Sequence, residues 1–185
     1  MKKILLISLF TMTTSIAFAA GNPIKTGDVL GRDLSVYGLG SLGHTGLLVS
    51  TNNVVQVMNE TPYVNVVQYV TVSGFKTDTY WGARAKSSFG FRQPYTSAAN
   101  QITAISNIQR PHVAYTLYSS TPSPAIQVCS SYNSSGACTA YTWQKGTFRC
   151  DGFTKWLYTQ TGNGNLGGST PNGTYTSSLL TITRT

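Results

Sequence analysis

The chain has few charged side chains and very few of the residues that bind metals. Its 185 residues include five acidic residues and two histidines, and the histidines stand far apart, at His44 and His112. Their spacing matches no metal-binding motif, so the sequence predicts neither a metal nor another cofactor. The thirteen Lys and Arg residues are scattered and accompany no nucleic-acid-binding motif. This pattern argues against nucleic acid as a partner.

Long apolar runs are also scarce. Residues 1–3 carry two lysines, residues 4–10 are mostly apolar, and residues 17–19 form a small-x-small cleavage site. Together they predict a secretory signal peptide over residues 1–19, with an uncleaved anchor as the alternative. No later stretch is long and apolar enough to cross a membrane. We therefore expect an exported protein, periplasmic or secreted, without a stable membrane span.

The remaining residues, 20–185, have the length of one compact domain. They are rich in Gly, Ser, Thr, Asn and Tyr, a composition typical of β-rich exported domains. Loss of the two lysines near the start lowers the formal net charge from +8 to +6. A positive charge favours anionic partners such as cell-wall polymers, although it also occurs in basic exported proteins that are simply soluble.

Cysteine is rare, and its number is odd. With three cysteines, at most one intramolecular disulfide can form in an oxidising compartment. Cys129 and Cys138 flank a polar turn of Ser, Asn and Gly, which favours a hairpin disulfide between them. Cys150 is then left as a free thiol. Such a thiol is reactive, packed and inert, or paired with another chain, and the motif around it favours reactivity.

Cys150 precedes a segment with helical periodicity. Phe153, Trp156 and Leu157 recur at the spacing that forms one apolar stripe, so we predict a helix with Cys150 in its first turn. Unpaired N–H groups and the positive end of the helix dipole favour a thiolate at such a position. Cys150 is therefore the candidate nucleophile.

A predicted β-hairpin supplies a candidate base. Residues 43–50 and 54–58 are β-rich runs joined by an Asn-containing turn. His44 begins the first run and can lie across from Gln56 in the second. The Gln56 side-chain carbonyl can then accept from the imidazole, whereas a solvent-facing strand residue is its alternative role. His112 is expected to have a surface or structural role.

Two segments resemble the NlpC/P60 group of papain-like cysteine peptidases. Around the cysteine, the matching residues are Tyr141-x-Trp143, Gly146 and Phe148-x-Cys150-x-Gly152-Phe153. Around the histidine, they are Gly27-Asp28, His44-x-Gly46 and Gln56, twelve residues after His44. The loop between Trp143 and Phe148 is shorter than in the family. Arg149 and Asp151 also flank the cysteine where the family more often has Asp and Ser.

The two segments occur in reversed order, because the histidine segment comes first and no histidine follows Cys150. This order is similar to that of the circularly permuted branch, which includes YaeF/YiiX-like proteins and relatives of lecithin retinol acyltransferase. The resemblance implies an acyl-enzyme mechanism in which Cys150 attacks, His44 transfers the proton and Gln56 orients His44. It also implies that the Tyr141 hydroxyl lies beside the Cys150 N–H as an oxyanion donor, with packing as the alternative role for Tyr141.

The other patterns predict an α+β domain, in which a small antiparallel sheet packs against the cysteine-bearing helix. By resemblance this is the papain-like, circularly permuted NlpC/P60 fold. Residues 113–118 fit a strand or an aromatic loop. The remaining predicted elements are strands at 26–31, 63–72, 78–85 and 177–183, a helix at 95–108 and a loop at 162–174.

Three functions follow as hypotheses. The first is an exported cysteine amidase that cleaves amide bonds in peptidoglycan peptides, with peptidoglycan or another anionic envelope polymer as its partner. The second keeps the same catalytic residues but hydrolyses or transfers lipid or acyl groups. The third is a non-catalytic module that binds the cell wall.

Overall fold

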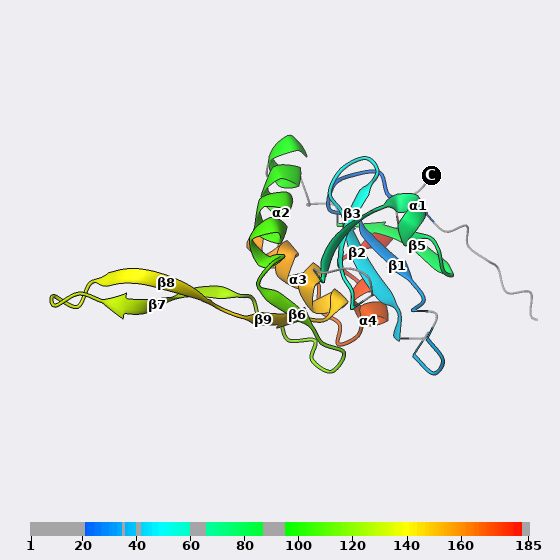
Figure 1. Ribbon diagram of the computed structural model, residues 1–185. Coiled ribbons are helices and arrows are strands. Elements are labelled where there is room, and N and C mark those ends of the chain that lie inside the picture. Colours follow the sequence, from blue (N-terminus) through cyan, green and yellow to red (C-terminus); the bar gives the residue numbers. More distant parts are fainter. Residues whose placement is uncertain (1–20, 35, 40–41, 60–65, 87–94, 183–185) are drawn as a thin grey trace, which may run out of the picture.

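The computed structural model describes residues 21–34, 36–39, 42–59, 66–86 and 95–182. The predicted signal peptide lies outside the described residues, as does part of the strand expected at 63–72. The described residues form one larger antiparallel sheet, two small two-stranded sheets and four helices (Figure 1). The predicted fold class is therefore confirmed as α+β with a mainly antiparallel sheet.

The larger sheet has six strands in the order β10-β5-β1-β2-β3-β4, and all neighbouring strands are antiparallel. In chain order the strands are β1 (Val29–Arg32), β2 (His44–Leu48), β3 (Asn53–Val57), β4 (Val67–Thr71), β5 (Tyr80–Ala85) and β10 (Thr181–Ile182). The hairpin predicted around His44 is thus formed by β2 and β3. It lies inside the sheet, where both of its strands have neighbours.

Two helices pack on one face of this sheet, α3 (Cys150–Gln160) and α4 (Pro171–Tyr175) (Figure 1). The predicted stripe of α3 is buried there through Phe153 and Leu157, with Trp156 partly buried beside them. The sheet contributes an apolar layer to this core, formed by Val29, Leu47, Val49, Val55, Val57 and Val67. Burial of such side chains stabilises the fold by roughly 1.5–3 kcal/mol each.

The other face carries a smaller core around the short helix α1 (Val72–Phe75). Phe75 is buried there against a group of apolar side chains from four strands, Leu30, Leu48, Val54 and Ala83. Side chains alternate between the two faces along each strand. Leu47 therefore packs towards α3 and its neighbour Leu48 towards Phe75, and this alternation also sets the direction of His44.

Two predictions near the C-terminus are wrong. Residues 162–174 do not form only a loop, because α4 begins at Pro171. Of the described residues in the strand expected at 177–183, only Thr181–Ile182 form a strand. Helix α4 begins there because the Thr170 side chain accepts a hydrogen bond from the Gly173 N–H at 3.0 Å. A helix of one turn leaves no periodic apolar pattern in the sequence.

The helix predicted at 95–108 is confirmed as α2 (Tyr95–Gln109). After it, β6 (Val113–Tyr115) pairs in parallel with β9 (Gly146–Phe148). This pairing places Tyr115 opposite Phe148, two residues before Cys150. In the described part of the chain, no helix has both the length and the apolar character needed to cross a membrane.

A separate hairpin projects from the body of the molecule (Figure 1). It consists of β7 (Ile126–Tyr132) and β8 (Cys138–Gln144), which form their own two-stranded sheet. The predicted disulfide, Cys129–Cys138, joins the two strands near the turn. Because two isolated strands are marginally stable in water, this disulfide is a main constraint on the hairpin.

We expect replacement of both cysteines, Cys129→Ser with Cys138→Ser, to loosen the hairpin and leave the body folded. Loss of a short disulfide-closed loop costs about 3 kcal/mol of local stability. Hydrogen exchange should become faster in β7 and β8 but not in β1 to β3. Equal acceleration in both regions would show that the hairpin supports the whole domain.

Candidate active site

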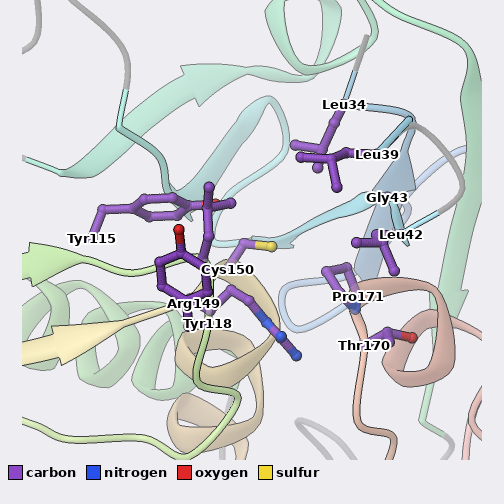
Figure 2. Close-up of a pocket in the computed structure, with 11 residues that line it drawn as sticks. Leu34, Leu39, Leu42, Gly43, Tyr115, Tyr118, Arg149, Cys150, Thr170 and Pro171 are labelled. Carbon is purple, nitrogen blue, oxygen red and sulfur yellow. The ribbon is translucent and has the colours of Figure 1, made fainter. Parts of the chain in front are cut away.

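Cys150 lies at the base of a pocket of about 300 Å³ between the first turn of α3 and the segment before β2 (Figure 2). The Cys150 side chain is otherwise buried, with a relative exposure of 1%. The pocket wall is mainly apolar, formed by Leu34, Leu39, Leu42, Leu117, Tyr115, Tyr118 and Pro171. Thr170 and Arg149 also line it. The thiol therefore faces a space suited to an apolar group.

Backbone N–H groups hold the Cys150 sulfur. Those of Thr45 and Asp151 both donate to it, and each lowers the pKa of the thiol. Burial is the larger effect, and together with the Asp151 charge it raises the pKa of Cys150 to about 11. The expectation that the helix N-terminus produces a thiolate is therefore not met in this structure. The resting group is a neutral thiol.

Asp151 is fully buried beneath the site, and its carboxylate forms ion pairs with two cationic side chains. Arg149 donates from Nε and Nη2 to its two carboxylate oxygens at 2.6 and 2.8 Å, and Lys155 Nζ lies 3.4 Å from Oδ2. Arg149 also donates to the Ser169 carbonyl. A buried carboxylate requires such partners. These contacts tie the first turn of α3 to the segment before α4.

His44 and Gln56 form the hydrogen bond expected of a base and its orienting residue. His44 Nε2 lies 2.8 Å from Gln56 Oε1, and both side chains are buried. Since an amide oxygen only accepts, Nε2 carries the proton and Nδ1 has a lone pair. Burial and the Arg32 charge lower the pKa of His44 to about 3, against the opposing effect of the Gln56 bond. The imidazole is therefore neutral.

Close packing around Gly46 explains why the His-x-Gly motif has a glycine at this position. A Cβ atom at this position would lie 2.6 Å from Val54 Cγ1 and 2.8 Å from Phe75 Cε2. Without it, the Phe75 ring packs close to the strand and stacks on His44, with ring centroids 5.5 Å apart. The glycine thus creates the apolar contact that holds the imidazole.

The structure brings Cys150 next to the backbone of the His44 segment but does not join the two side chains. Strands β2 and β3 pair at Leu47 and Leu48, so the start of β2 has a strand partner only on its β1 side, and the Thr45 N–H binds the thiol. His44 points instead towards Phe75, and its Nδ1 is buried without a hydrogen-bond partner. The candidate nucleophile and the candidate base thus lie on the two sides of β2, each in its neutral form, and are not hydrogen-bonded to each other.

The expectation for Tyr141 is not met. Tyr141 lies on the projecting hairpin, paired with Cys129, and is 64% exposed. The tyrosine beside the thiol is Tyr115, which lines the pocket and whose pKa is raised by burial and by Cys150. Sequence reasoning missed it because the parallel pairing of β6 with β9 leaves no local signal.

His112 has a structural contact, as expected. Its ring stacks on Trp143 at the base of the hairpin, with centroids 4.2 Å apart. It is not among the residues that line the pocket. Within the described ranges, no group of three or more His, Cys, Asp or Glu residues could hold a metal ion.

Comparisons of the chain with family models, curated proteins and solved structures return no match.

The raised pKa of the thiol predicts how Cys150 reacts with iodoacetamide. With a pKa of about 11, roughly one thiol in ten thousand is ionised at pH 7. The alkylation rate should therefore rise about tenfold per pH unit between pH 7 and 10, measured by mass on the protein without ligand. A rate that levels off below pH 8 would show a preformed thiolate instead.

The lowered pKa of His44 predicts a loss of stability in acid. Between its ordinary pKa of 6.5 and its folded value of about 3, the unfolded chain binds a proton that the native state does not. The free energy of unfolding should fall as pH decreases through this window, by at most about 1.4 kcal/mol per pH unit. In His44→Gln this contribution should vanish. The free energy of unfolding of both proteins can be measured by urea titration at several pH values. An identical pH dependence in the two proteins would contradict the lowered pKa of His44.

Proposed function

We propose that the protein is an exported cysteine acyl hydrolase or acyltransferase with a circularly permuted, papain-like fold of the NlpC/P60 kind. Cys150 is its nucleophile, His44 its base and Gln56 the residue that orients His44. The observation that carries the proposal is the position of the Cys150 thiol at the base of an apolar pocket, next to the strand that bears a buried His–Gln pair.

The pocket favours the acyl hypothesis over the peptidoglycan one. Peptidoglycan peptides are polar and carry carboxylates, whereas the wall around the thiol consists largely of leucine and tyrosine side chains. Each methylene buried against such a wall contributes about 0.8 kcal/mol to binding. An acyl chain therefore gains affinity from this wall, whereas a muropeptide loses hydration against it and finds polar partners only at Arg149, Thr170 and the tyrosine hydroxyls among the lining residues.

The arrangement of elements supports the permuted fold. The hairpin with His44 and Gln56 precedes the cysteine helix in the chain, yet α3 packs directly on β2 and β3. A papain-like site needs the cysteine helix beside the histidine strand, whatever their order along the chain. In this chain α3 makes that contact with β2 although the histidine segment comes before the cysteine segment.

The proposed reaction begins when the acyl chain enters the pocket and its carbonyl carbon meets Sγ. His44 Nδ1 takes the thiol proton as the S–C bond forms, and His44 then gives this proton to the departing alcohol or amine. The product is a thioester on Cys150. Water or an acceptor hydroxyl, deprotonated by His44, then attacks the thioester and regenerates the thiol. The Cys150 N–H and the Tyr115 hydroxyl are the proposed donors to the oxyanion.

The electrostatics favour a neutral resting pair, as in serine hydrolases. The raised pKa of Cys150 and the lowered pKa of His44 both oppose a thiolate–imidazolium ion pair. Proton transfer therefore accompanies attack on the bound substrate and does not precede it. Alignment of Nδ1 with Sγ is the step that substrate binding must bring about.

The test uses residues 20–185, p-nitrophenyl esters of increasing chain length, and purified peptidoglycan. We expect turnover that increases from acetyl to medium-chain esters and an acyl adduct on Cys150 in the mass spectrum. Cys150→Ala should abolish both. Leu117→Asp, in the pocket, should lower kcat/KM for the long ester about tenfold and leave the acetyl ester nearly unchanged.

Leu179→Asp is the matched control, because Leu179 is 51% exposed and Leu117 48%, and Leu179 does not line the pocket. The control should behave as the parent protein does. Release of muropeptides by the parent but not by Cys150→Ala would replace the acyl proposal with the amidase. Absence of turnover and adduct on every substrate would leave a binding module.

A further inference from the structure

A second glutamine lies behind the His44–Gln56 pair. Gln68, on β4, is directly opposite Gln56 on β3, and it is 3% exposed. Gln56 Nε2 donates to Gln68 Oε1 at 3.3 Å, and Gln68 Nε2 donates to the Met58 carbonyl oxygen at 3.4 Å. Four groups thus form one continuous buried chain of hydrogen bonds.

The direction of this chain is set at its far end. The Met58 carbonyl oxygen can only accept, so the NH₂ group of Gln68 faces it and the Gln68 oxygen faces Gln56. This oxygen in turn requires the NH₂ group of Gln56, which turns Gln56 Oε1 towards His44. The imidazole must then carry its proton on Nε2.

We propose that Gln68 is a positioning residue that determines the tautomer of His44 through Gln56. The consequence for the reaction rests on the proposed function, because only the tautomer with a free lone pair on Nδ1 can take a proton from Cys150. The tautomer itself is a property of the folded protein and does not depend on any substrate.

The alternative arrangement is disfavoured because the chain is buried. If the Gln56 amide were turned over, its oxygen would face the Gln68 oxygen, and two acceptors would lie in contact without a proton between them. A buried, unpaired polar group shifts such an equilibrium about tenfold or more. Without Gln68, Gln56 has no partner that distinguishes its two orientations, and both tautomers of His44 become populated.

The two histidines of the chain make the test direct. Long-range ¹H–¹⁵N spectra of histidine-labelled protein at pH 7 distinguish protonated from unprotonated ring nitrogens. In the parent protein, we expect His44 with its proton on Nε2 alone. In Gln68→Met, which has similar size but no amide, a second tautomer with the proton on Nδ1 should appear. In Gln68→Glu, burial beside the Met58 carbonyl keeps the carboxyl group protonated, so it donates to that carbonyl and still accepts from Gln56, and the original tautomer should persist.

Gln109→Met is the matched control. Gln109 is 5% exposed and its amide also makes two hydrogen bonds, to the backbone of Ala125, outside this chain. Its loss should leave the His44 tautomer unchanged. With a substrate that the enzyme turns over, Gln68→Met should lower kcat about tenfold with little change in KM, and Gln68→Glu should restore most of it.

Two results would overturn the proposal. A proton on Nδ1 in the parent protein would do so without any variant, even if Gln68→Met failed to fold. An unchanged tautomer in folded Gln68→Met would show that Gln56 is oriented by other contacts. Neither result depends on activity, so inactivity towards every ester would reject the proposed function and leave this inference standing on its own spectra.

Discussion

The contact between the first turn of α3 and the start of β2 is the interaction on which the site depends. The Thr45 N–H donates to the Cys150 sulfur, and the Thr45 hydroxyl lies 3.4 Å from that of Thr154, one turn further along α3. This contact is available because β3 pairs only with the later part of β2. The N-terminus of α3 thus packs against the β3 side of the start of β2, and Cys150 lies beside the strand that carries His44.

Burial decides the protonation state of both proposed catalytic groups. At the helix N-terminus two N–H groups favour a charged sulfur, yet removal of the thiol from water outweighs them. Buried Asp151 adds to the effect, although Arg149 and Lys155 offset much of its charge. On the other side of β2, burial and a nearby arginine keep His44 neutral. Position along a helix therefore predicts little about a thiol until its solvent exposure is known.

The elements that depend on local sequence patterns were predicted correctly. Periodicity placed α3, and the alternation and turn placed the hairpin that joins His44 to Gln56. Prediction failed where the contact is non-local. The chain from Gln56 to Gln68 needs the register between β3 and β4, and Tyr115 needs the parallel pairing with β9. The burial of Cys150 depends on side chains from several separate segments, none of which has a pattern that identifies it as a neighbour.

The neutral state of Cys150 has a consequence in the oxidising compartment that we propose for the protein. An exposed thiolate there would be oxidised or would exchange with the hairpin disulfide, whereas a buried thiol with a raised pKa resists both reactions. The same burial lowers its reactivity towards substrates. In the proposed reaction, an apolar chain that fills the pocket supplies binding energy to align the carbonyl with Sγ and Nδ1, and a small polar molecule does not. In the proposed function, protection of the free thiol and preference for an apolar substrate thus have one physical origin, the removal of the thiol from water.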